Sequence, residues 1–237
     1  MSLLSWWHIP FFKALVSYTR KYYEAAISKM DMIIVNSENV RKRVKKYIGM
    51  DSQVVYPPCE TGAFKWCGQE GYYLSTARLE NFKRVDVIVR AFLDMPDQKL
   101  IVTSGGTELD RLKKIADGAG NIKFTGWTGE DELHRLMGNA IATIYIPKDE
   151  DFGMSPVESM AAGKPVIGVK EGGLLESVIN GETGALLRPD PCEEDVVDAV
   201  RHMDPKTALD MRRACEKQAV RFDKKIFLEK MKRILSQ

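Results

Sequence analysis

Short apolar runs rich in β-branched residues recur along the whole chain. Most are continuous rather than alternating, and such runs are typical of strands buried on both faces of a parallel sheet. They end near glycine, proline or acidic residues, as strands do where they pass into loops. The predicted strands are residues 32–35, 53–56, 72–76, 99–103, 122–125, 141–146, 165–169 and 185–187.

Longer amphipathic segments lie between these runs, and this alternation predicts the fold class. Strands that alternate with helices form a parallel sheet covered on both faces, so we expect an α/β fold with a Rossmann-like, doubly wound parallel sheet. One long helix should precede the first strand. The other predicted helices are residues 37–47, 85–95, 108–117, 130–137, 156–162, 174–179, 193–202, 208–220 and 226–235.

A stretch without periodicity divides the chain unequally. Residues 57–70 contain Pro57, Pro58, Gly62 and Gly68, and they read as a linker. Residues 71–237 are long enough for one complete doubly wound domain, and the final helix could reach back onto the segment before the linker. Residues 1–56 are too few for a second such domain, so we interpret them as the remnant of one.

Composition excludes several classes of protein. The 237 residues are 44% hydrophobic and 29% charged, with a net charge of +2, which is ordinary for a globular domain and gives no signal for nucleic-acid binding. The four cysteines form no C-x-x-C pair and the three histidines are scattered, so we predict no metal site and reduced thiols in a cytoplasmic setting. The first 16 residues are too short and too interrupted to span a bilayer.

The segment with the clearest chemistry is the loop and helix that follow strand 141–146. Ser155 is a suitable N-cap, Pro156 suits the first helical position and Gly163 ends the helix. In open α/β sheets, ligands bind where loops leave the carboxyl ends of the strands. A helix that begins there offers free amide groups to a phosphate, so an anion could be held without a metal.

Two glutamates of this segment each have two interpretations. Glu158 stands three residues after Ser155 and could act only as a capping-box residue of its own helix. Glu150 lies between Asp149 and Asp151 and could be a solvated loop acid. Alternatively, each carboxylate could accept hydrogen bonds from neighbouring sugar hydroxyls, and a glycine turn between them would let the pair hold both ends of a nucleotide sugar.

The spacing of these glutamates carries a family resemblance. The stretch Glu150-Asp-Phe-Gly-Met-Ser-Pro-Val-Glu158 resembles the E-x7-E motif of retaining glycosyltransferases with two facing Rossmann-like domains, the family-4 type of the GT-B fold. The rest of the pattern follows in the family's order, and the wording around Glu158 is most similar to mannosyltransferases of polysaccharide assembly. The matching segments are Asn36-Ser37, Val55-Tyr-Pro-Pro58, Ala77-Arg-Leu79 with Lys83, Gly126, Gly172-Gly173 and Asn180-Gly-Glu-Thr-Gly184.

The resemblance implies roles for some of the matching residues. Residues 71–237 would be the nucleotide-sugar-binding, C-terminal half of a GT-B enzyme. Glu158 would hold the ribose hydroxyls, Glu150 would contact the donor sugar, and the backbone amides of Gly153, Met154 and Ser155 would meet the sugar and phosphate.

A second group of residues follows strand 72–76. Arg78 and Lys83 occupy the loop after it, where two cations suit a diphosphate, although an ordinary basic loop is the plainer interpretation. In the resembled family, cations at these positions offset the charge of the leaving diphosphate in place of a metal ion. This chain has Thr-Ala-Arg where Gly-Arg is usual, and Lys-Arg where Lys-Gly is usual.

Other motifs are weaker. Asp149-Glu-Asp151 spells the D-x-D motif of metal-dependent glycosyltransferases, but its position inside E-x7-E favours a metal-free site. Gly105 and Gly173 could approach the nucleotide or could serve plain turns, as could Glu176 beside Gly173. Trp127 is expected to be a packing residue rather than a platform for the base, and His8 is left without a role.

These observations lead to one principal function and two alternatives. We expect a hexosyltransferase, of mannose in particular, that uses a nucleotide-diphosphate sugar without a separate cofactor and acts on a glycan or lipid-linked acceptor. The alternatives are a non-catalytic donor-binding fragment or subunit, completed by a partner chain that supplies the other half, and a sugar-nucleotide epimerase, which E-x7-E disfavours. The basic run Arg41, Lys42, Arg43, Lys45 and Lys46 is either a solvated helix face or a peripheral contact with the inner membrane surface.

Overall fold

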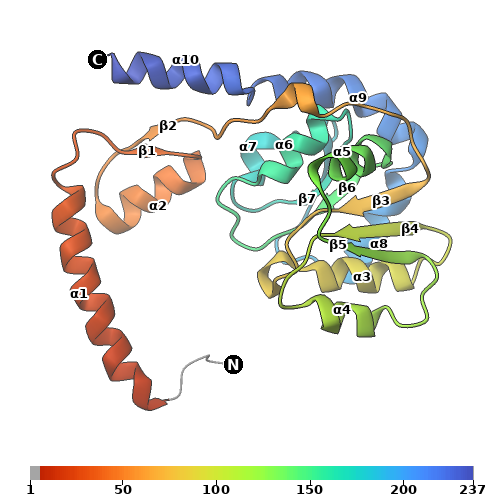
Figure 1. The fold of residues 1–237 in the computed structure, drawn as a ribbon, viewed down its shortest axis with the longest axis horizontal. Coiled ribbons are helices and arrows are strands. Elements are labelled where there is room, and N and C mark those ends of the chain that lie inside the picture. The colour runs from red at the N-terminus through yellow and green to blue at the C-terminus, as the bar shows by residue number, and fades with distance from the viewer. Residues whose placement is uncertain (1–5, 237) are drawn as a thin grey trace.

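The computed structural model describes residues 6–236, and within them the strands form two separate parallel sheets. The larger has six strands in the order β5-β4-β3-β6-β7-β8 (Figure 1). All of its neighbouring strands are parallel. Its strands are β3 (Tyr72–Ser75), β4 (Lys99–Thr103), β5 (Ile122–Gly126), β6 (Thr143–Tyr145), β7 (Val166–Val169) and β8 (Gly184–Leu187).

Helices cover both faces of this sheet, as the continuous apolar strands predict. Neighbouring tyrosines of β3 show the two faces directly. The Tyr73 hydroxyl donates to the carbonyls of Val200 and Met203 at the end of α8 (Glu193–His202). The Tyr72 hydroxyl donates to the Leu136 carbonyl in α5 (Glu130–Asn139) on the opposite face. Every residue of β3 and β7 is buried. The predicted α/β, doubly wound parallel sheet is therefore confirmed.

Each predicted helix is present, with small shifts at its ends. Helices α3, α4 and α8 lie along one face of the sheet and α5, α6 and α9 along the other (Figure 1). The helices are α1 (Ile9–Ile27), α2 (Glu38–Ile48), α3 (Val85–Leu93), α4 (Leu109–Ile115), α5 (Glu130–Asn139), α6 (Met154–Ala161), α7 (Leu174–Ser177), α8 (Glu193–His202), α9 (Pro205–Val220) and α10 (Lys224–Leu235).

The predicted start of α6 is wrong by two residues. The N-cap position belongs to Gly153, which has φ +85°, and Ser155 already lies in the first turn without a capping hydrogen bond. Glu158 therefore cannot form a capping box with Ser155, and that interpretation of Glu158 falls away. A glycine in this backbone region turns the chain into the helix earlier than a serine cap would.

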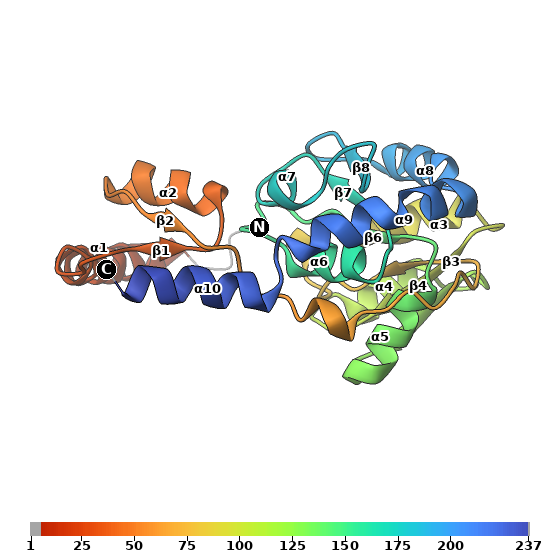
Figure 2. The same cartoon turned by 90° about the horizontal axis from the view of Figure 1, so that it is seen from above.

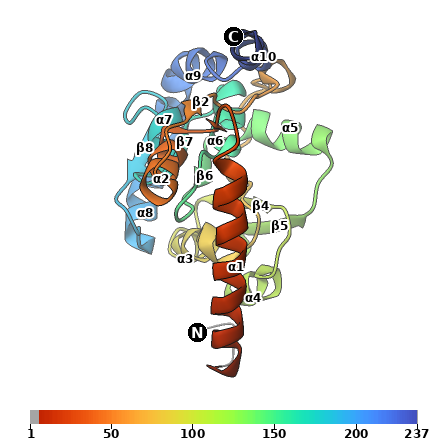
Figure 3. The same ribbon diagram turned by 90° about the vertical axis from the view of Figure 1, so that its left-hand side faces the viewer.

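The first segment, residues 6–56, contains the second sheet. Strands β1 (Ile34–Val35) and β2 (Gln53–Val54) are parallel and are connected by α2. No residue of α1 is buried. This helix lies apart from the six-stranded sheet in Figure 1 and in front of it in Figure 3. Among the described residues, no helix combines the length and apolar character needed to cross a bilayer.

Residues 57–70 are held to the end of the chain rather than loose. The Cys59 amide donates to the Phe222 carbonyl at 2.8 Å, and the Lys224 amide donates to the Cys59 carbonyl at 3.0 Å. Helix α10 then leaves the six-stranded sheet in the direction of β1 and β2 (Figure 2). Its Lys230 ammonium lies 5.7 Å from the centre of the Tyr56 ring, so the last helix does reach the end of the first segment.

Candidate functional site

The loops that follow β3 and β6 leave the sheet side by side. These strands are direct neighbours, with Leu74 opposite Thr143, so both loops emerge at the same carboxyl edge. The Lys83 ammonium lies 2.5 Å from Glu150 Oε2. The expected meeting of these two distant segments is therefore confirmed for Lys83 and Glu150.

A tyrosine completes this network. The Tyr145 hydroxyl donates to Glu150 Oε2 at 2.9 Å and lies 3.1 Å from the Lys83 ammonium. Only 15% of the Lys83 side chain and 18% of the Glu150 side chain are exposed. Burial and the nearby Glu150 charge raise the pKa of Tyr145, so it stays a hydrogen-bond donor at neutral pH. The sequence analysis did not identify Tyr145, which reads there as one residue of a buried strand.

Glu158 is a carboxylate without a polar partner among the described residues. Burial raises the pKa of Glu158. The pKa of the nearby Cys59 thiol is raised to about 12, first by burial and then by the negative charge of Glu158. Glu158 is half-buried, and a carboxylate that is partly removed from water without hydrogen bonds is destabilising, so hydroxyl groups of a ligand would lower that cost. Glu158 is therefore suited to accept hydrogen bonds from a bound molecule.

The raised pKa of Glu158 gives a pH-dependent prediction. The folded chain protonates this carboxyl more readily than the unfolded chain, so its charge lowers stability once the pH exceeds its ordinary pKa of about 4.3. We expect Glu158→Gln to stabilise the ligand-free protein at pH 7 by on the order of 1 kcal/mol. The gain should shrink as the pH falls toward 4, as measured by urea unfolding. A variant less stable than wild type at pH 7 would contradict it.

Arg78 lies apart from the buried network. Its side chain is 67% exposed, and it forms a 3.5 Å ion pair with Glu80 of the same loop. The structure therefore brings one of the two predicted cations, Lys83, to Glu150 and leaves Arg78 on the rim, where its role in diphosphate binding stays a prediction.

Arg84, which directly follows Lys83 in the chain, holds three loops together, a role that the sequence analysis did not identify. Its guanidinium lies 3.1 Å from Glu171 and 3.1 Å from Asp190, in the loops after β7 and β8. Its φ of +52° is in the left-handed region, where glycine is the favoured residue. The unusual Lys-Arg pair thus places an arginine in a conformation suited to glycine, and the ion pairs offset that strain.

Two substitutions of Arg84 should differ in a way that reveals this strain. Arg84→Ala loses both ion pairs and keeps the left-handed backbone, so it should lower the free energy of unfolding by roughly 1–2 kcal/mol. Arg84→Gly loses the same pairs but relieves the backbone, so it should be more stable than the alanine variant by about 1 kcal/mol. Thermal unfolding measures both. An alanine variant as stable as the glycine variant would show that the backbone at residue 84 is unstrained.

The glycines of the site pack loops closely against one another. A Cβ at Gly172 would lie 2.3 Å from the Glu150 carbonyl oxygen, and one at Gly173 would lie 2.3 Å from the Phe152 Cα. The Gly173 amide already donates to the Glu150 carbonyl at 3.0 Å. At Gly153 the nearest side chains, of Leu174, Glu150 and Tyr145, would lie 3.2–3.4 Å from a Cβ. Direct contact of these glycines with a donor remains a prediction.

Gly105 lies beneath an exposed indole ring. A Cβ at this position would lie 2.4 Å from Trp127 Nε1, and Trp127 is 72% exposed. Trp127 therefore packs against Gly105, as expected of a packing residue, although most of its ring is exposed. Its ring covers Gly105 at the end of β4 because the preceding residue, Gly126, turns the chain with φ +71°. No contact between Gly105 and a ligand is established.

Helix α2 lies against the loop that carries Glu150. Arg43 forms an ion pair with Asp151, and Arg41 forms one with Asp51 at 3.1 Å. Glu176, for which the sequence left open a place toward the donor or in a plain turn, accepts hydrogen bonds from the first amides of α2. Of the five cations predicted to contact a membrane, Lys42, Lys45 and Lys46 have no ion pair with a described residue.

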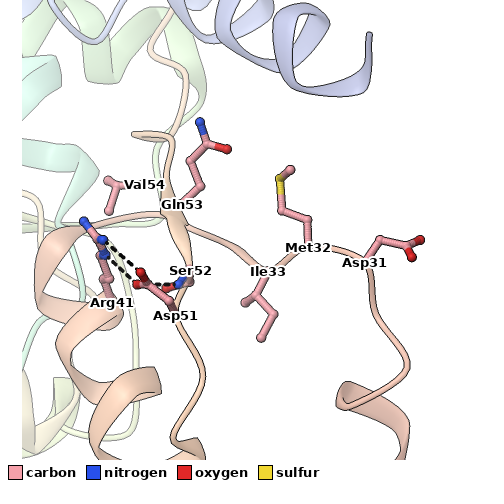
Figure 4. Close-up of a pocket in the computed structure, with 8 residues that line it drawn as sticks. All are labelled: Asp31, Met32, Ile33, Arg41, Asp51, Ser52, Gln53 and Val54. Atoms are coloured by element: carbon pink, nitrogen blue, oxygen red, sulfur yellow. Dashed lines mark hydrogen bonds and ion pairs between the residues drawn. The ribbon is translucent and has the colours of Figure 1, made fainter. Parts of the chain in front are cut away.

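Two cavities lie near the first segment. One of about 550 Å³ is lined by Asn39, Arg43, Tyr47, Asp149 and Gly172 and adjoins the Glu150 loop. The other, of about 400 Å³, is shown in Figure 4, where Arg41 bridges to Asp51 beneath Gln53 and Val54. None of the predicted site residues lines this second cavity. In the described part of the chain, no group of three or more His, Cys, Asp or Glu is placed to hold a metal ion.

The six-stranded sheet and the loops at its carboxyl edge define the class of protein as a glycosyltransferase of the GT-B fold. More closely, the chain belongs to the family of glycosyl transferases group 1, whose model matches residues 63–221.

Curated relatives include mannosyltransferases. Alpha-1,3/1,6-mannosyltransferase ALG2 of Dictyostelium discoideum is 27% identical over 207 residues, which cover 67% of this chain and 49% of that protein. An uncharacterized glycosyltransferase of Methanocaldococcus jannaschii is 24% identical and covers 89% of this chain and 60% of its own length. The chain spans about half the length of the mannosyltransferase relatives that it matches.

Solved structures share the fold at low identity. Sucrose-phosphate synthase from Thermosynechococcus elongatus matches with a TM-score of 0.81 at 20% identity, over 91% of this chain and 60% of that one. Anabaena HepE, solved in complex with UDP and glucose, matches with a TM-score of 0.78 at 20% identity, over 87% of this chain and 63% of that one.

Proposed function

We propose that this chain is the donor-binding part of a retaining glycosyltransferase that transfers a hexose, specifically mannose, from a nucleotide-diphosphate sugar to a glycan or lipid-linked acceptor. In this proposal, residues 71–237 bind the donor, residues 57–70 are the linker and residues 1–56 are part of the acceptor-binding half. The observation that carries the proposal is the buried Lys83–Glu150–Tyr145 network at the carboxyl edge of the sheet, with Glu158 free to accept hydrogen bonds.

In this proposal, different side chains bind different parts of the donor. Glu158 would accept hydrogen bonds from the two ribose hydroxyls, and Glu150 would accept them from the sugar. Lys83, with Arg78 on the rim, would offset the charge of the diphosphate as the bond to the sugar breaks. The amides of Gly153, Met154 and Ser155, at the start of α6, would add hydrogen bonds to the sugar and phosphate.

The mannosyl assignment and the acceptor rest on similarity. ALG2 of Mus musculus, another mannosyltransferase relative, is 26% identical over 216 residues, and the HepE structure holds UDP and glucose. The base and the sugar are therefore best determined by titrating GDP-, UDP- and ADP-sugars into the purified chain by calorimetry. For a given base, we expect the mannose nucleotide to bind more tightly than the glucose nucleotide. Failure of every nucleotide sugar to bind at millimolar concentration would refute the proposal.

Metal independence is a separate prediction. Because Lys83, Arg78 and the first turn of α6 supply the positive charge, the affinity for the donor should change less than twofold in excess EDTA. Calorimetric titration with and without EDTA, and with Mn²⁺ or Mg²⁺ restored, measures this. A strict requirement for either ion would instead assign Asp149 and Asp151 to a metal.

A second candidate function is a donor-binding subunit without activity of its own. One observation favours it: α1 has no buried residue and is free to pack against another chain. A partner chain would then supply the acceptor-binding surface. Sugar transfer to an acceptor distinguishes the enzyme from the subunit.

The location of the protein is also part of the proposal. We place it in the cytoplasm, with peripheral contact to the inner membrane face through Lys42, Lys45 and Lys46, which are not used in ion pairs within the described chain. Such cations add attraction to anionic lipids, at about 1 kcal/mol for each residue near the surface.

A further inference from the structure

The start of α2 rests on the backbone of the loop that carries Glu150. The Ser37 hydroxyl donates to the Asp151 carbonyl at 2.6 Å, and the Asn39 side-chain amide donates to the Glu150 carbonyl at 3.1 Å. These residues are more than 100 positions apart in the chain. Helix α2 therefore holds two consecutive backbone carbonyls of the candidate site.

Glu176 fixes the same helix from the other side. Its Oε2 accepts from the Glu38 amide at 2.8 Å and its Oε1 accepts from the Asn39 amide at 2.9 Å. Ser37 Oγ accepts from the Val40 amide at 3.0 Å. The first three amides of α2 are thereby satisfied, and a negative charge lies at the positive end of the helix dipole.

The Glu150 carbonyl is held from two directions. It accepts a hydrogen bond from the Gly173 amide at 3.0 Å and a second one from the Asn39 side chain. These two bonds use both lone pairs of the Glu150 carbonyl oxygen. Gly173 and Glu176 stand at the two ends of one short stretch around α7 (Leu174–Ser177). Helix α7, helix α2 and the Glu150 loop therefore close a ring of contacts, and its effect is to fix the backbone from which the Glu150 side chain reaches Lys83 and Tyr145.

We propose that Asn39 and Glu176 are positioning residues for Glu150, so that docking of α2 and binding of the donor sugar are coupled. The positioning of Glu150 by Asn39 and Glu176 rests on the observed contacts alone. The coupling to the donor sugar rests in addition on the proposed function. Because coupling of this kind is reciprocal, a bound sugar should stabilise the contact with α2 as much as the contact strengthens sugar binding.

The first experiment needs no ligand. Amide hydrogen exchange, read by mass spectrometry, compares wild type with Asn39→Ala, Asn39→Asp and Glu176→Gln. Asn39→Asp keeps the shape of the side chain but cannot donate to the Glu150 carbonyl. Glu182→Gln is the matched control, since Glu182 is exposed and its side chain forms no hydrogen bond or ion pair with a described residue. We expect faster exchange in residues 149–154 and at Gly173 in the three variants and no change in the control.

The second experiment separates positioning from general stability. Calorimetry on Asn39→Ala should show the nucleotide sugar bound about threefold to tenfold more weakly, as for loss of one neutral hydrogen bond. The free nucleoside diphosphate should bind as in wild type, because it contacts Glu158 rather than Glu150. A merely structural role would weaken both ligands alike.

The outcomes keep the two proposals apart. Unchanged exchange in residues 149–154 in all three variants overturns the positioning role, whether or not any ligand binds. Equal weakening of nucleotide and nucleotide sugar also overturns it. A wild-type chain that binds no nucleotide sugar refutes the proposed function, while the exchange data still decide whether α2 holds the loop. If Glu176→Gln does not fold, the two Asn39 variants provide the same decision.

Discussion

The purified chain should bind nucleotide sugars and yet transfer little or no sugar to an acceptor. Transfer requires the acceptor hydroxyl to be held in line with the anomeric carbon, and such positioning can contribute roughly 7–11 kcal/mol to the lowering of the barrier. The described residues before the linker provide only α1, α2 and the two short strands β1 and β2. These elements are too few to form the facing wall of a cleft, and water entering the site would weaken its electrostatics.

A direct measurement of transfer checks this expectation. With a radiolabelled donor and a lipid-linked or glycan acceptor, we expect a rate at least a thousandfold below that of a longer relative assayed in parallel, on the order that the positioning energy allows. Donor binding measured on the same preparation shows that the chain is folded. Robust turnover by the monomer without a second protein would show that the acceptor site lies within the described residues.

The exposed face of α1 gives the same prediction a second readout. Large apolar side chains are exposed on and just before this helix: Trp7, Phe11, Phe12, Leu15 and Tyr22. The sequence places Trp6 in the same group, but its side chain lies outside the described part of the structure. Apolar surface of this extent favours self-association or docking onto a partner. Sedimentation should therefore detect oligomers of the wild-type chain that a Phe11→Ser, Leu15→Ser, Tyr22→Ser variant lacks.

Substitutions of Glu158 and Glu150 should have different effects on the affinity for the free nucleotide and for the nucleotide sugar. Glu158→Gln should weaken the free nucleoside diphosphate and the nucleotide sugar by the same factor, because the ribose is common to both. Glu150→Gln should weaken only the nucleotide sugar. Loss of a hydrogen bond to a charged group costs roughly 1.5–3 kcal/mol, which corresponds to about tenfold to a hundredfold in affinity.

Calorimetry with both ligands on both variants measures this division. Glu182→Gln serves again as the control and should bind both ligands as wild type does. Glu150→Gln also leaves Lys83 without its charged partner, so the unfolding temperature of each variant should be compared before its affinity is interpreted. Equal effects of the two variants on the free nucleotide would refute the assigned roles.

Local sequence patterns were sufficient for the architecture. The strands of the six-stranded sheet and the helices between them appear where the apolar runs and amphipathic segments place them, because burial on both faces of a parallel sheet leaves a continuous apolar signature. The meeting of Lys83 with Glu150 was also predictable, since both follow strands whose carboxyl ends share one edge.

Contacts between distant segments were not predictable in the same way. Ser37 and Asn39 read as the polar start of a helix, and nothing local to them indicates the Glu150 loop as their partner. The start of α6 was misplaced because a serine cap and a glycine in the positive-φ region compete for the same turn, and the packing around Gly153 decides between them. Trp127 was expected to be a packing residue, but its exposure could not be foreseen because it depends on the turn at Gly126.

The attachment of Cys59 to the junction of α9 and α10 has a mechanical consequence. Cys59 and Asp223 form an isolated backbone β-bridge, and the Thr61 hydroxyl donates to the Asp223 carboxylate. The linker and the junction of α9 and α10 are therefore joined at one point beside the six-stranded sheet. The backbone connects the first segment to the six-stranded sheet only through the linker, so any movement of that segment relative to the sheet should hinge at residues 55–58, before Cys59. Residues 59–70 should then move together with the sheet.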